Sequence, residues 1–314
     1  MSLKNENEIN KKFSSAVDHY KNNNFPKAIN LFKKIILLNS KNINAYLNLG
    51  VIFFKMKNFK ESIKFYKKAL KINPNHIDSF NNIGVAYREQ GNFHKALENF
   101  KSIIKLNPNN LGALNNIGLI LIDLKNIKES KQYFQKVLKI DPNHVDALNN
   151  IGIAFKNEKK YQNSIKSYKK VIDINPNYIN AYYNLGCIYK ELNSYDEAIK
   201  YLNNTIKIFK EHEGALLALG IIYEEQGKYD KALEFYDRII KINPTNKNAI
   251  NNIGVVLLNT GRIKEAKINL KKALKIDPSL IGAYWNLCGT ASSVEEATAI
   301  LNQILKIDAN KTET

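Results

Sequence analysis

One side-chain amide recurs along the chain at a fixed spacing. Seven asparagines lie 34 residues apart, or at a multiple of 34, and the only gap in the series is filled by Ala218. A side-chain amide carries two N–H donors and a carbonyl acceptor, so it can bond to both the N–H and the C=O of a peptide. A row of these amides could hold an extended backbone whatever its side chains are. The candidate peptide-binding residues are Asn48, Asn82, Asn116, Asn150, Asn184, Asn252 and Asn286.

A second interpretation of the asparagines is structural. The same amides could tie neighbouring segments to one another, and asparagine is abundant throughout this chain. The only tryptophan, Trp285, stands directly before Asn286 and is a further candidate. It could anchor a ligand, as aromatic residues often do in interfaces, or it could cap the last segment.

The other chemically capable residues are too dispersed to form a site. His76, His144 and His212 lie 68 residues apart, so they cannot share a metal in an array of stacked segments. Two cysteines, Cys187 and Cys288, are too few for a disulfide framework or a zinc site. No glycine-rich phosphate loop or paired catalytic carboxylate is found. We expect no catalytic residue, no metal and no cofactor, and therefore a protein that is not an enzyme.

Short helices must position the asparagines. Residues 77–110 contain two stretches of apolar residues at helical spacing, which predict two amphipathic helices. Gly91 lies between them and can adopt the positive φ of a tight turn. Pro108 follows the second stretch and stops that helix, because the residue before a proline avoids helical geometry. The apolar positions are Phe80, Ile83, Gly84, Tyr87, Leu97, Phe100, Ile103 and Ile104.

The unit repeats every 34 residues, and its glycines and prolines share the period. A glycine inside a helix costs about 1 kcal/mol relative to alanine, so a packing gain must offset that cost in each repeat. Small residues at the Ala96 position and large ones at the Phe100 position predict that successive layers interlock. The glycines are Gly50, Gly84, Gly118, Gly152, Gly186, Gly220 and Gly254, and the prolines are Pro74, Pro108, Pro142, Pro176, Pro244 and Pro278.

The pattern large-x-x-Leu/Ile-Gly-x-x-Tyr, then Ala-x-x-x-Phe, then Pro, resembles the tetratricopeptide repeat. The resemblance covers residues 9–311, as eight full repeats followed by a shortened ninth at 281–311. Residues 1–8 are expected to be a polar extension and residues 312–314 a tail. The first repeat departs from the pattern at Ala16 and Ser40, and Lys210 replaces a proline, which predicts a weaker helix end there.

The resemblance implies an all-α fold, a right-handed superhelical solenoid of helix–turn–helix units with a concave groove lined by the first helix of each repeat. It also implies a noncatalytic scaffold that binds a protein or an extended peptide in that groove. The asparagines are similar to the asparagine ladder in the tetratricopeptide arm of O-linked N-acetylglucosamine transferases. An alternative is therefore the substrate-recognition arm of a glycosyltransferase or similar enzyme whose catalytic domain is not in this chain.

The net charge of +18 comes almost entirely from lysine. Most lysines fall on the second helix of each repeat, which places them on the outer, convex face. A solvated surface is the simpler interpretation, and a surface for acidic partners is the other. The predicted groove has mixed charges, so we expect no nucleic-acid partner. No signal peptide or membrane span is apparent, and a cytoplasmic location is expected, whereas the oligomeric state is left open.

Overall fold

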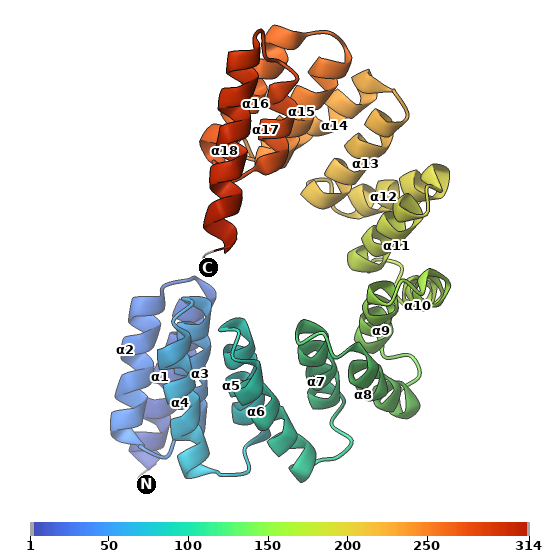
Figure 1. The fold of residues 1–314 in the computed structure, drawn as a ribbon. Coiled ribbons are helices and arrows are strands. Elements are labelled where there is room, and N and C mark those ends of the chain that lie inside the picture. Colours follow the sequence, from blue (N-terminus) through green and yellow to red (C-terminus); the bar gives the residue numbers. More distant parts are fainter. Residues whose placement is uncertain (1–2, 313–314) are drawn as a thin grey trace. The chain divides into compact units, whose positions relative to one another are not determined.

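The computed structural model describes residues 3–312, and the side chains of residues 5–307. Every element in that range is an α-helix (Figure 1), which confirms the predicted all-α fold of helix–turn–helix units. The helices are α1 (Leu3–Lys21), α2 (Phe25–Leu38), α3 (Ile43–Lys55), α4 (Phe59–Ile72), α5 (Ile77–Glu89), α6 (Phe93–Leu106), α7 (Leu111–Asp123), α8 (Ile127–Ile140), α9 (Val145–Asn157), α10 (Tyr161–Ile174), α11 (Ile179–Glu191), α12 (Tyr195–Ile208), α13 (Glu213–Glu225), α14 (Tyr229–Ile242), α15 (Lys247–Asn259), α16 (Ile263–Ile276), α17 (Ile281–Cys288) and α18 (Val294–Thr312).

The chain divides within α10 into an N-terminal unit that ends at Ser167 and a C-terminal unit that begins at Tyr168. Within the first, consecutive helices from α1 to α9 pack on one another, and within the second the same holds from α11 to α18. The first helices of successive repeats also touch, as α7 and α9 do, and as α11, α13, α15 and α17 do in series. Candidate asparagines therefore lie on adjacent helices. No helix in residues 3–312 is both long enough and apolar enough to cross a bilayer.

The recurring glycines let the two helices of a repeat approach closely. A Cβ atom built on Gly118 would stand 2.5 Å from the Phe134 ring, and one built on Gly220 would stand 2.3 Å from the Tyr236 ring. Each contact joins a first-helix glycine to the large second-helix residue sixteen positions later. The close approach of helices that the sequence predicts at the recurring glycines is confirmed at these two positions.

The three histidines that recur at 68-residue intervals cap first helices. The His212 Nδ1 accepts a hydrogen bond from the Ala215 backbone N–H at 3.0 Å, and His76 and His144 accept in the same way. Asparagine does this at the same position in other repeats, where the Asn110 side-chain oxygen accepts from the Ala113 N–H at 2.9 Å. These caps satisfy N–H groups that have no partner inside the helix.

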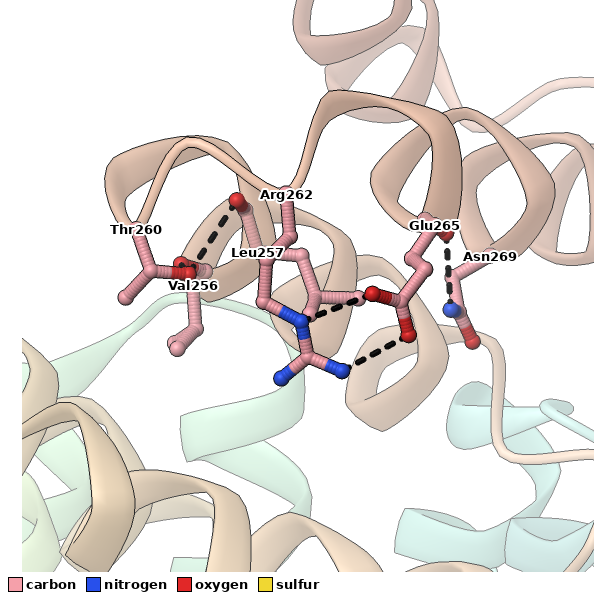
Figure 2. A network of polar contacts seen from close by, with 6 residues as sticks. All are labelled: Val256, Leu257, Thr260, Arg262, Glu265 and Asn269. Carbon is pink, nitrogen blue, oxygen red and sulfur yellow. Dashed lines mark hydrogen bonds and ion pairs between the residues drawn. The ribbon is translucent and has the colours of Figure 1, made fainter.

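In each of the first eight repeats, the turn between the two helices is closed by one residue at positive φ. In the turn from α15 to α16 this residue is Gly261, with φ of 76°. Figure 2 shows the flanking contacts. The Thr260 hydroxyl lies within hydrogen-bond distance of the Val256 and Leu257 carbonyl oxygens, and the Arg262 guanidinium donates two hydrogen bonds to the Glu265 carboxylate, at 2.8 and 2.7 Å. Arginine has no acceptor with which to cap α16, so this paired contact orders the first turn instead.

Helix α12 ends at the usual position of the repeat although Lys210 replaces the proline, and the weaker helix end that the sequence predicts there stays a prediction. Helix α12 stops at Ile208 and has 14 residues, as α4, α6 and α8 have. The Phe209 N–H donates to the Thr205 carbonyl oxygen at 2.9 Å. The buried Thr205 hydroxyl donates to the Tyr201 carbonyl oxygen at 3.1 Å. Packing and local bonds therefore end this helix without a proline.

Candidate peptide-binding face

The candidate asparagines lie on the first helices, and we call the surface formed by these helices in each unit its first-helix face. In the N-terminal unit this face is carried by α3, α5, α7 and α9, and in the C-terminal unit by α11, α13, α15 and α17. Six of the seven candidate side chains are half-buried, whereas Asn150 is only 6% exposed. The asparagines are thus not equivalent, and their side-chain hydrogen bonds divide them into four groups.

Three asparagines keep most of their bonding capacity. The side chains of Asn116 and Asn184 make no hydrogen bond with any part of the chain that the structure describes, and the Asn82 side chain only accepts one from the neighbouring Asn81 amide at 3.4 Å. A half-buried amide without a protein partner must bond to water or to a ligand. These three are the asparagines whose surroundings suit peptide binding.

Two asparagines instead join neighbouring repeats. The Asn150 amide donates to the Asn115 side-chain oxygen at 3.0 Å, and the Asn286 amide donates to Asn251 at the same distance. In both pairs the acceptor stands 35 residues earlier, one position before the candidate asparagine of the preceding repeat. Sequence reasoning missed this second asparagine position. Its signal was the doublet Asn-Asn, which occurs at this position of the repeat in four copies, at 81–82, 115–116, 149–150 and 251–252.

Asn252 belongs to a polar chain inside the C-terminal unit. Its amide donates to the Tyr236 hydroxyl oxygen at 3.4 Å, and that hydroxyl donates to the Glu224 carboxylate at 2.7 Å. Burial raises the pKa of Glu224, although the hydrogen bond from Tyr236 acts in the opposite direction. Burial also raises the pKa of Tyr236. Asn48 bonds within its own helix, where its amide donates to the Asn44 carbonyl oxygen at 2.8 Å.

An apolar cavity opens beside Asn82 in the N-terminal unit. It has a volume of about 130 Å³ and is lined by Val51, Phe54, Tyr66, Asn82 and Val85. Val51 and Val85 each follow a repeat glycine, a half-buried apolar position in every repeat from α3 to α15. The cavity is close in size to one of about 150 Å³ that holds benzene in another protein, so one apolar side chain would fit. It places an amide beside an apolar recess.

Trp285 lies on α17 with 58% of its surface exposed, next to Asn286.

Charges on the first-helix face are partly paired: the Arg88 guanidinium on α5 contacts the Asp123 carboxylate on α7 at 3.1 Å. Within the described residues, no group of three or more His, Cys, Asp or Glu side chains could hold a metal ion.

Paired helices stacked in chain order define a helical-repeat protein in the range that the structure describes. The family models described as tetratricopeptide repeat match residues 43–76, 77–110, 111–144, 179–212, 215–246 and 248–280. A further model, described as TPR repeat, matches residues 155–192. Together these matches cover well over half of the chain, which therefore belongs to the tetratricopeptide repeat family. A comparison with curated protein sequences gives no significant match.

Solved structures with the same fold are numerous. A tetratricopeptide repeat protein from Parabacteroides merdae is 18% identical, with a TM-score of 0.60, over 79% of this chain and 98% of that one. The type IV pilus biogenesis factor PilW is 20% identical, with a TM-score of 0.60, over 66% and 96%. The APC/C hetero-tetramer Cut9-Hcn1 is 17% identical, with a TM-score of 0.60, over 90% and 57%. At these identities the likeness shows the fold alone.

Proposed function

We propose that the protein is a noncatalytic scaffold that binds an extended peptide segment of a partner protein on the first-helix face. The observation that carries the proposal is the cavity beside Asn82, where a half-buried amide stands next to an apolar recess. The amide suits a peptide N–H or C=O, and the recess suits an apolar side chain of the same segment. Membership of the tetratricopeptide repeat family supports a protein-interaction role.

The candidate asparagines have two kinds of role, ligand binding and the joining of neighbouring repeats. Asn82 and Asn116 contact the ligand backbone in the N-terminal unit, and Asn184 can do so in the C-terminal unit, because the amides of these residues have little or no bonding within the described chain. Asn150 and Asn286 hold repeats together through Asn115 and Asn251, and they keep the neighbouring first helices in register. Trp285, exposed on α17, supplies an aromatic anchor in the C-terminal unit.

The test begins with ligands selected from a displayed library of random twelve-residue peptides, with affinities measured by fluorescence anisotropy. The double variant Asn82→Ala/Asn116→Ala should weaken unrelated selected peptides by about tenfold or more, because each amide contributes one or two bonds of about 0.5–1.5 kcal/mol. The loss should change little with salt, since no ion pair is broken.

The matched control is Asn163→Ala/Asn203→Ala, which removes two exposed asparagines from the second helices α10 and α12. It should leave both affinity and melting temperature unchanged. Normal binding by the Asn82/Asn116 variant would contradict the proposal. A large fall in its melting temperature would show instead that these amides are structural.

A further inference from the structure

One face of helix α4 carries an unusual row of lysines. The row has five members, and their spacing of four, three, one and three residues keeps them on one side of the helix. No other second helix in the described chain has lysine at all five equivalent positions; α16 comes nearest, with four and an isoleucine at the fifth. The α4 row consists of Lys60, Lys64, Lys67, Lys68 and Lys71.

The same five lysines line a cavity of about 530 Å³ whose other lining residues are Ile63, Tyr87 and Gln90. Ile63 is 7% exposed and Tyr87, on the next first helix, is half-buried, so they form an apolar floor beneath the ammonium groups. The cavity shares no residue with the one beside Asn82. It is a second concave surface, on the other helix of the repeat.

Little in the chain neutralises these lysines. Lys64 pairs with Glu61 at 3.0 Å, and the Lys68 ammonium lies 5.5 Å from the centre of the Phe65 ring. The ammonium groups of the remaining three, Lys60, Lys67 and Lys71, make no ion pair or hydrogen bond with the described residues. Like charges three and four residues apart on a helix repel one another. A bound anion would relieve that repulsion.

We infer that the α4 face binds an acidic peptide segment with several carboxylates and one apolar side chain. The row from Lys60 to Lys71 spans about 16 Å at the helical rise, which is about five residues of an extended peptide. Five point charges suit dispersed carboxylates, whereas all five lack the planar, two-pronged geometry with which arginine recognises phosphate and nucleic acid. The floor of Ile63 and Tyr87 accommodates the apolar side chain.

The test uses a fluorescein-labelled peptide of eight glutamates around a central phenylalanine, and anisotropy at low and physiological salt. Lys60→Glu/Lys67→Glu/Lys71→Glu should weaken binding by at least about tenfold, because three exposed charge contacts become repulsive. The matched control is Lys264→Glu/Lys271→Glu/Lys275→Glu, which makes the same charge change at the equivalent positions of α16. Since α16 has Lys267 in place of Ile63, the control should lose less than about threefold. All six lysines are exposed, and circular dichroism should show unchanged helix content.

Equal losses in the two triple variants would overturn the inference, because the peptide would then respond only to net charge. Replacing the central phenylalanine by serine should weaken binding to the wild-type protein; no change would remove the role of the apolar floor. A labelled single-stranded RNA could instead bind more tightly than the peptide, with that binding lost in the α4 variant alone. This result would identify a nucleic-acid site and would also overturn the inference.

Discussion

The side-chain amide of Asn150 donates a hydrogen bond to the side-chain oxygen of Asn115 over 3.0 Å, although 35 residues separate them. The two side chains are 6% and 9% exposed, and they belong to the first helices α9 and α7. Burial makes this bond costly to break, because a buried amide left without a partner loses the hydration that it has in the unfolded chain. An asparagine series that suggests ligand binding in the sequence thus includes bonds between repeats.

Replacing Asn115 by alanine should therefore destabilise the protein by about 1–3 kcal/mol, because the Asn150 amide would stay buried without an acceptor. Asn116→Ala, one residue away on α7 and without a hydrogen bond to the described chain, should change stability by less than about 0.5 kcal/mol. Urea unfolding followed by circular dichroism measures both variants. Equal changes in stability for the two variants would mean that the bond between Asn150 and Asn115 does not contribute to the stability of the protein.

Gly118→Ala should destabilise the protein by about 1–3 kcal/mol, because the added Cβ atom would stand 2.5 Å from the Phe134 ring and force it to move. Gly112→Ala is a control in the same helix, at an exposed position where the new Cβ would meet only Asn110 Oδ1, at a comfortable 3.5 Å. This control should stabilise the folded protein by about 0.4–1 kcal/mol, because alanine lowers the conformational entropy of the unfolded chain. Thermal unfolding tests the opposite signs, and destabilisation by both changes would contradict the close-packing account.

We expect the protein to lose stability at acid pH through the ion pairs of Glu158. Its carboxylate contacts the Lys131 ammonium at 2.6 Å and the Lys160 ammonium at 2.8 Å, and hydrogen bonds from both lower its pKa, with Lys131 the larger cause. A folded-state pKa below the unfolded value contributes stability above the unfolded pKa, and that contribution disappears as the pH falls through the folded pKa. Glu158→Gln should remove this part of the pH dependence below about pH 5. An unchanged pH profile of the melting temperature would refute the assignment.

For Glu224 we expect the opposite effect of pH on stability. Burial raises its pKa, so ionising it at neutral pH opposes folding, whereas below the unfolded pKa the group is protonated in both states and contributes nothing. Glu224→Gln keeps an oxygen that can accept the Tyr236 hydrogen bond and removes the charge. It should raise the melting temperature at pH 7 and have little effect near pH 3. A variant less stable at pH 7 would show that the charged form strengthens the bond from Tyr236 by more than burial costs.

The helical pairs could be predicted from the sequence because their causes are local and repeated. The spacing of Phe80, Ile83 and Tyr87 is visible within one turn or two of a helix. The recurrence of glycine at one helical position in seven repeats predicted a close contact there, although it did not name Phe134 as the partner of Gly118. Lys210 shows the limit of such rules: α12 ends at Ile208 without a proline, because bonds and packing around Thr205 act there together.

The role of each asparagine side chain in the series depends on the tertiary structure. Asn116 and Asn150 occupy the same position of the repeat, yet Asn150 is buried against Asn115 and Asn116 is left without a partner in the described chain. The difference depends on how closely neighbouring first helices approach and on which residue stands one repeat earlier. The lysines of α4 could likewise be counted in the sequence. Their cavity exists only because Tyr87, sixteen residues after Lys71, packs over Ile63 from the next helix, and local spacing does not encode a contact between helices.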